Sequence, residues 1–197
     1  MADLMPVPAF DGRGLLPPYL GANSAVPGHR SPYLSSMAEL VSVLGGTPER
    51  CNLLLGLLQY RSMLHSLGYT DGLQFVDGSF VENVETREGR GPRDIDVFSF
   101  LIRPARYRGN DPLWQSTGFP QWVGEIVNQS LNKQRYQLDT YAIAVDQTGP
   151  LQLMNETIYW YSLFSHKRVT QEWKGFVAVP LNISDDQVAL SAITSGP

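Results

Sequence analysis

The residues most suited to chemistry are two aspartates separated by one position, Asp94 and Asp96. They stand at the start of an apolar run that ends at Ile102 and is typical of a β-strand, where side chains two positions apart lie on one face. Unpaired carboxylates are costly in such an apolar setting, and two on one face are suited to sharing a cation. The pair alone is weak evidence, because Asp-x-Asp often arises by chance.

A third acid, Asp139, lies in another apolar run. If the two strands are neighbours, three carboxylates converge, and each pair about 4 Å apart repels by roughly 1 kcal/mol in water and roughly 4 kcal/mol at an intermediate dielectric. One or two divalent cations would remove this repulsion, and oxygen ligands without His or Cys favour Mg²⁺ or Mn²⁺ over Zn²⁺. The alternative is that Asp139 caps a turn and that the aspartate pair bonds to Arg93 or Arg103.

A Gly-Ser pair, Gly78 and Ser79, follows a short apolar run over 73–76 and precedes the acidic strand. Glycine lets a backbone approach a ligand closely, and a serine hydroxyl with adjacent amides can hold phosphate oxygens. The order of strand, Gly-Ser and Asp-x-Asp therefore suits a triphosphate bound beside a metal. Taken singly, the Gly-Ser pair is also an ordinary tight turn.

The elements that would position these residues are those of an α/β (α+β) protein with a mixed sheet. Ser36 and Glu39 form a capping-box pattern before one helix, and Thr47 with Pro48 begins a longer one. We expect, in order, helices over 37–44 and 48–67, strands over 73–76 and 95–101, a helix over 121–132, a strand over 136–145, a further helix, and a strand over 173–181.

Three regions are expected along the chain. Residues 1–35 are rich in Pro and Gly and predict an extended arm on the domain or on a partner. Residues 36–181 form the domain, and 182–197 a C-terminal tail that frays. Within the domain, the polar stretch over 83–93 predicts a flexible hairpin connection.

The length, charge and cysteine content of the chain exclude several classes of protein. The 197 residues suit one domain, and 15 basic against 19 acidic residues argue against a protein that coats nucleic acid. The single cysteine, Cys51, excludes an intramolecular disulfide and a zinc finger and favours the reducing cytoplasm. Neither a signal peptide nor a membrane span is expected.

The motifs together resemble the nucleotidyltransferase fold of the DNA polymerase β type. The segments FVDGSFVEN, GPRDIDVFSFL, RYQLDTYAIAV and YWYSLFSHKRVTQEWKGFVAVPL are more closely similar to a little-characterised group of small bacterial and phage-associated nucleotidyltransferase-like proteins, over about residues 10–181. The resemblance implies a mixed-sheet palm with flanking helices. The insert around TREGRG is longer than in that group, which affects the pocket mouth.

The activity implied by the resemblance is transfer of a nucleoside monophosphate from an NTP such as ATP to an acceptor hydroxyl, with two Mg²⁺ or Mn²⁺ ions. Asp94 and Asp96 would bridge the metals, and Asp139 would hold the metal that activates the acceptor. The triphosphate would be bound by Gly78, Ser79, His166 and Lys174. A solvated surface charge explains His166 and Lys174 equally well, and it explains better the weaker candidates Arg87, Arg90, Arg93, Lys167 and Arg168. Trp160, Tyr161 and Trp173 would stack a base but are better expected in the core.

The acceptor is left open between protein, tRNA or another RNA, and a small molecule, in a toxin-antitoxin or phage-defence setting. Larger enzymes of this fold have a helical domain after the palm, whereas about sixteen residues follow Leu181 here, so a partner chain is expected to help select the acceptor. The alternative is a non-catalytic descendant that binds nucleotide or a partner protein, as an antitoxin or scaffold. A metal-dependent phosphohydrolase fits the order of elements less well.

Overall fold

The computed structural model describes residues 4–23, 25–26 and 29–195, so parts of the expected arm and of the expected tail lie outside the described residues. A five-stranded sheet runs through the molecule in the order β1-β5-β2-β3-β4. Strand β2 is antiparallel to both β5 and β3, whereas β1 with β5 and β3 with β4 are parallel. The expected α/β class with a mixed sheet is confirmed. The strands are β1 (Tyr33–Leu34), β2 (Gly72–Asp77), β3 (Ile95–Leu101), β4 (Leu138–Ala144) and β5 (Val177–Pro180).

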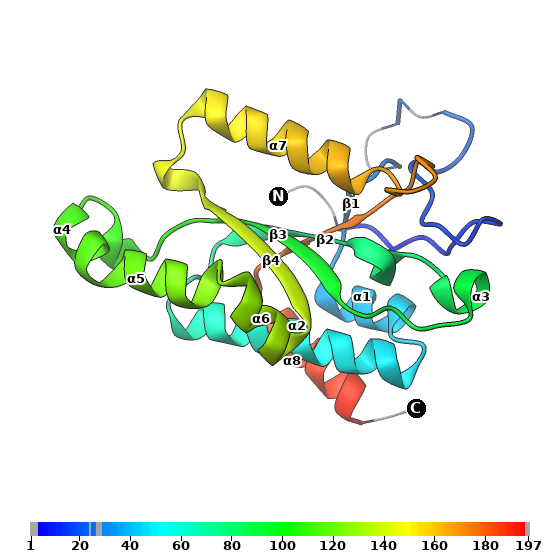
Figure 1. The fold of residues 1–197 in the computed structure, drawn as a ribbon, viewed down its shortest axis with the longest axis horizontal. Helices are drawn as coiled ribbons and strands as arrows, with labels where there is room; N and C mark the ends of the chain where they lie inside the picture. Colours follow the sequence, from blue (N-terminus) through cyan, green and yellow to red (C-terminus); the bar gives the residue numbers. More distant parts are fainter. Residues whose placement is uncertain (1–3, 24, 27–28, 196–197) are drawn as a thin grey trace.

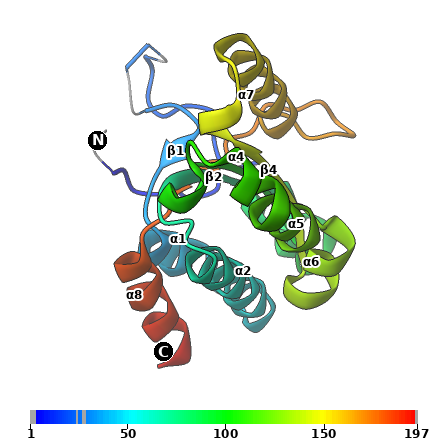
Figure 2. The same ribbon diagram turned by 90° about the vertical axis from the view of Figure 1, so that its left-hand side faces the viewer.

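Helices cover both faces of this sheet (Figures 1 and 2). The lower helical layer contains α1 (Met37–Leu44), α2 (Pro48–Ser66), α6 (Gln129–Tyr136) and α8 (Ile183–Thr194), and α7 (Pro150–Phe164) lies on the opposite face. The first two helices begin as expected, because the Ser36 and Thr47 side chains accept hydrogen bonds from backbone amides at 3.0 and 3.3 Å.

Side chains along β3 alternate between the two faces of the sheet. Ile95 and Val97 are buried in the core formed with the lower helical layer. Phe98 points the other way and stacks on Trp160 of α7, with ring centroids 4.4 Å apart. Because Asp96 has the parity of Phe98, its carboxylate lies on the α7 side of the sheet.

The expectation that the C-terminal tail frays is wrong, because residues 183–194 form α8 and pack on α1 and α2. Its anchor is Arg61, a fully buried arginine of α2. The Arg61 guanidinium donates to Asp186 Oδ1 at 2.8 Å, to Gln74 Oε1 at 2.7 Å and to the carbonyl of Pro180 at 2.8 Å. A buried guanidinium needs such partners, so α8 is part of the domain.

The polar connection over 83–93 is also more ordered than expected. It comes after a 3₁₀ turn, η1 (Gly78–Val81), and contains a short helix, α3 (Val84–Glu88). Val84 is fully buried, and Arg50 of α2 donates to Glu85 Oε1 at 2.6 Å. These contacts hold the connection against the domain.

The single helix expected over 121–132 is wrong, because several short helical segments occupy this region. The Asn128 side chain accepts from the amide of Leu131 at 3.1 Å, which begins α6 as a separate helix. Before α6, this region contains α5 (Phe119–Gln121) and the π-helical turn η4 (Trp122–Ile126). The short helical segments outside it are the 3₁₀ turns η2 (Ala105–Tyr107) and η5 (Val145–Gln147), α4 (Asp111–Leu113) and the π-helical turn η3 (Trp114–Gly118).

The described part of the N-terminal arm lies on the domain rather than apart from it. Leu15 and Leu16 are fully buried, and the amide of Gly175 donates to the carbonyl of Leu16 at 2.7 Å. The arm then enters the sheet as β1, an element that the sequence pattern did not indicate. The arm therefore contributes to the core.

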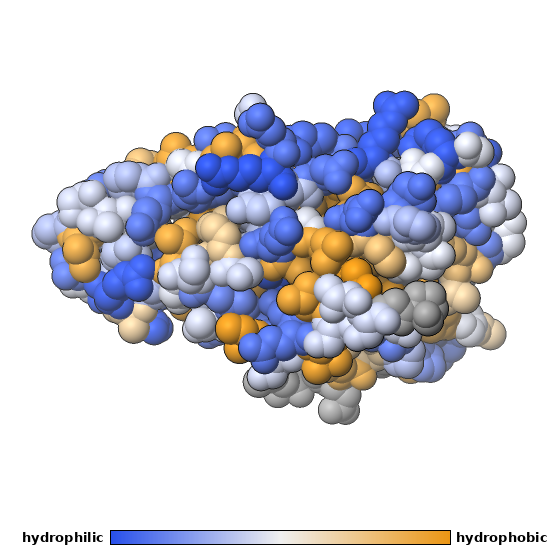
Figure 3. Space-filling model, turned by 90° about the horizontal axis from the view of Figure 1, so that it is seen from below, coloured by the Kyte–Doolittle hydropathy of each residue, from blue (hydrophilic) through white to orange (hydrophobic). Residues whose placement is uncertain are grey.

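On the side of the lower helical layer the surface mixes polar side chains with a central group of apolar ones (Figure 3). Ile183, Val188 and Leu190 are the exposed apolar residues of α8. Among the described helices, none is both long and apolar enough to cross a lipid bilayer.

Candidate functional site

A row of three aspartates crosses the sheet at one end of β2, β3 and β4. Asp77 is the register partner of Asp96, and Asp96 is the register partner of Asp139. The strands that carry the acids are therefore neighbours, and the three side chains lie on the α7 side of the sheet. Asp94 precedes β3 by one residue and stands beside this row.

The turn at the end of β2 brings Gly78 against this row. Gly78 has a φ of +85°, and a Cβ there would lie 2.7 Å from Asp96 Oδ2. Only glycine fits both the backbone conformation and the space. The next side chain, Ser79, lines the adjoining pocket, and within the described chain its hydroxyl forms no hydrogen bond. The Gly-Ser pair and the acids therefore meet in space.

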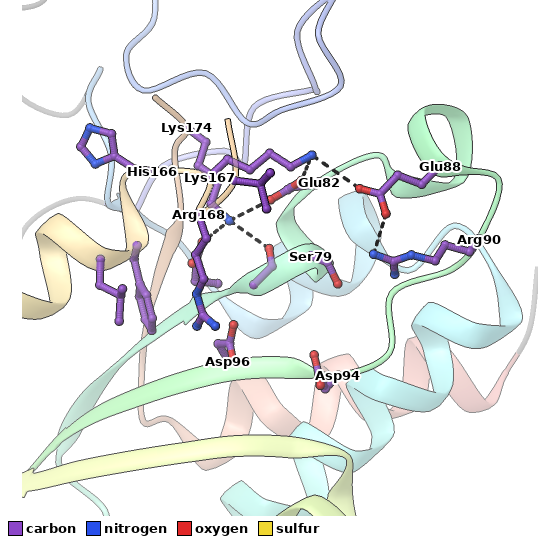
Figure 4. Close-up of a pocket in the computed structure, with 15 residues that line it drawn as sticks. Ser79, Glu82, Glu88, Arg90, Asp94, Asp96, His166, Lys167, Arg168 and Lys174 are labelled. Carbon is purple, nitrogen blue, oxygen red and sulfur yellow. Dashed lines mark hydrogen bonds and ion pairs between the residues drawn. The ribbon is translucent and has the colours of Figure 1, made fainter. Parts of the chain in front are cut away.

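Beside the acids lies a pocket of about 390 Å³, which we call the acid pocket (Figure 4). Acidic and basic side chains share its wall, together with the Gly-Ser turn. Its lining residues are Asp77, Gly78, Ser79, Glu82, Glu88, Arg90, Asp94, Asp96, Leu163, Phe164, His166, Lys167, Arg168, Val169 and Lys174. Asp139 is outside this lining and stands on the far side of Asp96.

Lys174 is a buried residue of the acid-pocket lining whose ammonium group is bound to other protein groups. It is 3% exposed, and its Nζ lies 3.0 Å from Asp77 Oδ1 and 3.1 Å from both Glu82 Oε1 and the carbonyl oxygen of Gly78. Burial alone would lower the pKa of Lys174, but the charges of Asp77 and Glu82 raise it overall. The expected nucleotide ligand Lys174 is therefore a charged support that holds the Gly-Ser turn.

The other basic residues of the region differ in what they contact. Arg168 points toward Asp96, and no carboxylate of the described residues lies within ion-pair distance of its guanidinium (Figure 4). His166 points away from the acids, and its Nδ1 lies 3.1 Å from the carbonyl oxygen of Ser162. Arg168 thus faces the acids, whereas the expected ligand His166 stands at the rim.

The remaining basic candidates are engaged or outside the acid pocket. Lys167 lies 3.4 Å from Glu82 and 3.5 Å from Glu88. Arg90 pairs with Glu88 at 2.6 Å, and Arg87 pairs with Glu172 at 3.4 Å. Arg93 is not in the lining.

The aromatic candidates divide between core and surface. Trp160 is buried at 7% exposure, and Tyr161 packs partly buried against Phe176. Trp173 is 57% exposed beside His166, so the expectation that it lies in the core is wrong.

Burial changes the acidity of the row. It raises the pKa of Asp77 to about 7, although the nearby Lys174 ammonium and the Gly78 amide lower it. Burial also raises the pKa of Asp96, and the charges of Asp94 and Asp139 raise it further. The carboxylate of Asp96 would therefore be stabilised by additional positive charge.

The two acids beside Asp96 already share the ammonium of Lys133, in the last turn of α6. Its Nζ donates to Asp139 Oδ2 at 2.7 Å and also to Asp94 Oδ2, so one ammonium bridges the two acids. Partial burial lowers the pKa of Lys133, but these hydrogen bonds raise it overall. An ammonium between two carboxylates is the charge arrangement that a metal ion would otherwise supply.

The donor set fits a divalent cation of the Mg²⁺ or Mn²⁺ type, because Asp94, Asp96 and Asp139 provide hard oxygen ligands and the pKa of Asp96 stays raised although Arg168 and Lys174 lower it. In the part of the chain that the structure describes, no three Asp, Glu, His or Cys side chains are already gathered into a metal-binding group. An ion would therefore compete with Lys133 for two of its ligands.

Three residues of the site lay outside the sequence predictions. Asp77 has a local signal, since it ends the strand directly before Gly78. Glu82 has none, because its partner Lys174 is 92 residues away, and Lys133 has little, because it bridges Asp139 to Asp94, which is 39 residues away.

Residues 8–180 match the model of a protein family described as a family of unknown function, DUF6932. The chain belongs to this family. The comparisons found no match to a curated protein or to a solved structure. The region matched by the DUF6932 model contains all five strands and every lining residue of the acid pocket, and it ends before α8.

Proposed function

We propose that this DUF6932 protein is a divalent-metal-dependent nucleotidyltransferase that transfers a nucleoside monophosphate from an NTP to an acceptor hydroxyl. The observation that carries the proposal is that Asp77, Asp96 and the Gly78-Ser79 turn line one pocket, with Asp139 next to Asp96 as its register partner. Acids for a metal and a turn for phosphates stand together there, as this reaction requires.

In this proposal each residue has a defined task. Asp94, Asp96 and Asp139 would hold the cations. The Gly78 backbone and the Ser79 hydroxyl would bind the triphosphate, and Arg168 would neutralise its charge. When bound, a divalent cation would neutralise phosphate charge and lower the pKa of the acceptor hydroxyl.

The bonding changes are those of phosphoryl transfer. The acceptor oxygen forms a bond to the α-phosphorus of the NTP, the bond to the bridging oxygen breaks, pyrophosphate leaves, and the hydroxyl proton is released. The lining of the acid pocket holds charged side chains of both signs, so it suits a polyphosphate bound together with a metal ion better than an apolar ligand. The acceptor stays open between protein, RNA and a small molecule.

The test is to incubate the protein with each of the four α-labelled NTPs, Mg²⁺ or Mn²⁺, and total cell extract. We expect label to move to one fraction, and the Asp96→Asn and Asp139→Asn variants to lose this transfer while remaining folded. Absence of transfer, together with no thermal stabilisation by millimolar metal plus any NTP, would contradict the proposal.

A second candidate is a non-catalytic protein that binds nucleotide or a partner chain. It is favoured by Lys133, whose single ammonium already forms ion pairs with both Asp94 and Asp139. Such a protein would be stabilised by NTP without metal and would transfer no label. The same two measurements therefore distinguish the candidates.

A further inference from the structure

A second cavity of about 530 Å³ adjoins the acid pocket. It shares Leu163 and the first residues of the loop after α7 with the acid pocket. Its lining residues, which define what we call the stacking cavity, are Ser162, Leu163, His166, Lys167, Arg168, Gln171 and Trp173. A ligand that extends from the acid pocket past Arg168 would enter this cavity.

Trp173 forms the aromatic wall of the stacking cavity. It is 57% exposed, whereas the other three tryptophans, Trp114, Trp122 and Trp160, are at most 9% exposed. An indole buries a large apolar area when it finds a partner, so a solvent-exposed tryptophan on a cavity wall is suited to contact a ligand.

The loop holds this indole in place. His166 and Trp173 pair as an isolated β-bridge, and the His166 ring meets the Trp173 ring edge-on with centroids 4.9 Å apart. The amide of Lys167 donates to the carbonyl of Glu172 at 2.9 Å, next to Trp173. The residue after Trp173 is the buried Lys174, which is tied to the Gly78 turn. The indole is therefore positioned relative to the acid pocket by short, defined connections.

We propose that Trp173 stacks on the base of the NTP whose triphosphate lies in the acid pocket, which makes the bound substrate a nucleoside triphosphate rather than a bare polyphosphate. This inference rests on the proposed function, because it needs the triphosphate beside Gly78-Ser79. Arg168 lines both cavities and lies where the phosphates would meet the nucleoside. Stacking on an indole is tolerant of base identity, so all four NTPs are expected to bind.

The test uses quenching of tryptophan fluorescence, which reports on Trp173 because the other three tryptophans emit but are buried away from a bound ligand. In the presence of Mg²⁺, NTPs are expected to quench the emission, and inorganic tripolyphosphate is not. Trp173→Phe should remove the quenching but keep NTP binding, because a phenyl ring still stacks. Trp173→Ala should weaken NTP binding roughly tenfold and leave tripolyphosphate binding unchanged. Binding in both variants is measured by calorimetry.

A matched control is Tyr159→Ala, which removes an aromatic side chain that is 58% exposed on α7 and lines neither cavity. It should bind NTP as the wild type does. Tripolyphosphate binding with no preference for NTP, or a Trp173→Ala variant with unchanged NTP affinity, would overturn the inference while leaving the phosphate site of the proposed function in place. Quenching by single-stranded RNA but not by NTP would also overturn it. Failure of both NTP and tripolyphosphate to bind would overturn the proposed function as well.

Discussion

At the scale of single residues, the site is defined by which charged groups already have partners. Lys174 and Lys167 are engaged with acids, whereas Arg168 and the Ser79 hydroxyl face the acid pocket without protein partners among the described residues. A polyanion would be bound by the groups that are free, because binding through an engaged lysine would first break a buried ion pair.

Ser79→Ala tests the free hydroxyl. We expect the affinity for an NTP with Mg²⁺ to fall about tenfold, because a hydrogen bond to a charged phosphate is lost. Stability should change by no more than about 0.5 kcal/mol, since the hydroxyl has no partner among the described residues. Calorimetric titration measures the first effect and thermal unfolding the second. Ser116→Ala, in an exposed serine remote from the acid pocket, is the control. A large loss of stability would instead assign the Ser79 hydroxyl a structural role.

Asp77→Asn tests the raised pKa of the buried acid. The folded-state pKa of about 7 lies above the ordinary value of 3.8, so the folded protein holds a proton that the unfolded chain has released between these two pH values. Asp77 therefore makes the protein less stable as pH rises from about 4 to 7, by at most about 1.4 kcal/mol per pH unit. The stability of Asp77→Asn relative to wild type should rise over this range, as measured by denaturant unfolding. A constant difference would show that Asp77 is ionised throughout.

At the scale of elements, the site depends on where neighbouring strands end and on the turns and helices attached to those ends. Three neighbouring strands place one aspartate each in register, and Lys133 of α6 lies six residues before Asp139 of β4. The end of α6 and the start of β4 thus supply an acid and its counter-ion, so the lysine and a metal ion would compete.

Lys133→Met tests this competition. Without metal, we expect a loss of about 1 kcal/mol or less, because the bridged ion pairs are partly exposed. With Mn²⁺, the gain in melting temperature should exceed that of the wild type, since Asp94 and Asp139 no longer have a competing ammonium. Arg135→Met is the control, because Arg135 lies on α6 like Lys133 and forms an exposed ion pair with Glu125 of η4. Equal Mn²⁺ responses in wild type and Lys133→Met would exclude the competition.

Much of this arrangement could be predicted from local patterns. The capping residues Ser36 and Thr47 predicted the starts of α1 and α2, and the apolar run after Asp94 predicted β3 with the bounds that the structure has. The sequence placed Asp96 and Asp139 in two apolar strands, and their convergence depended on these strands being neighbours, as they are.

The remainder depends on contacts that local patterns do not contain. The helix α8 lacks a strong apolar stripe and is held by Arg61, which lies 125 residues from Asp186 in the sequence. Strand β1 has two residues, too few for a periodic signal. Likewise, composition could not show that Lys174 forms ion pairs with Asp77 and Glu82 whereas Arg168 forms none with the described residues, because this depends on which acids surround each side chain.

At the scale of the whole molecule, α8 packs on α1 and α2 and so connects the C-terminal part of the described chain with the first two helices. Asp185 caps α1 by accepting from the Met37 and Ala38 amides, and Asp186 pairs with Arg61 and with His65. Two adjacent acids thus make contacts of different kinds, one near the surface and one largely buried.

Asp186→Ala should destabilise the protein by about 3 to 5 kcal/mol, because it leaves the buried Arg61 charge without its carboxylate. Asp185→Ala should cost about 1 kcal/mol, the usual effect of losing a helix cap. Denaturant unfolding of the two variants checks both values. Equal losses would show that α8 is held by its apolar contacts rather than by the Arg61 pair.

The place of β5 in the sheet has a consequence for the growing chain on the ribosome. Strands β2, β3 and β4 can pair as soon as they emerge, but β1 has no neighbour until residues 177–180 have been synthesised, since β5 lies between β1 and β2. The loop that carries Arg168 and Lys174 also appears only shortly before β5. A nascent chain therefore exposes Asp77, Asp96 and Asp139 before the loop with Arg168 and Lys174 follows, and the site is complete only after that loop and residues 177–180 have been synthesised.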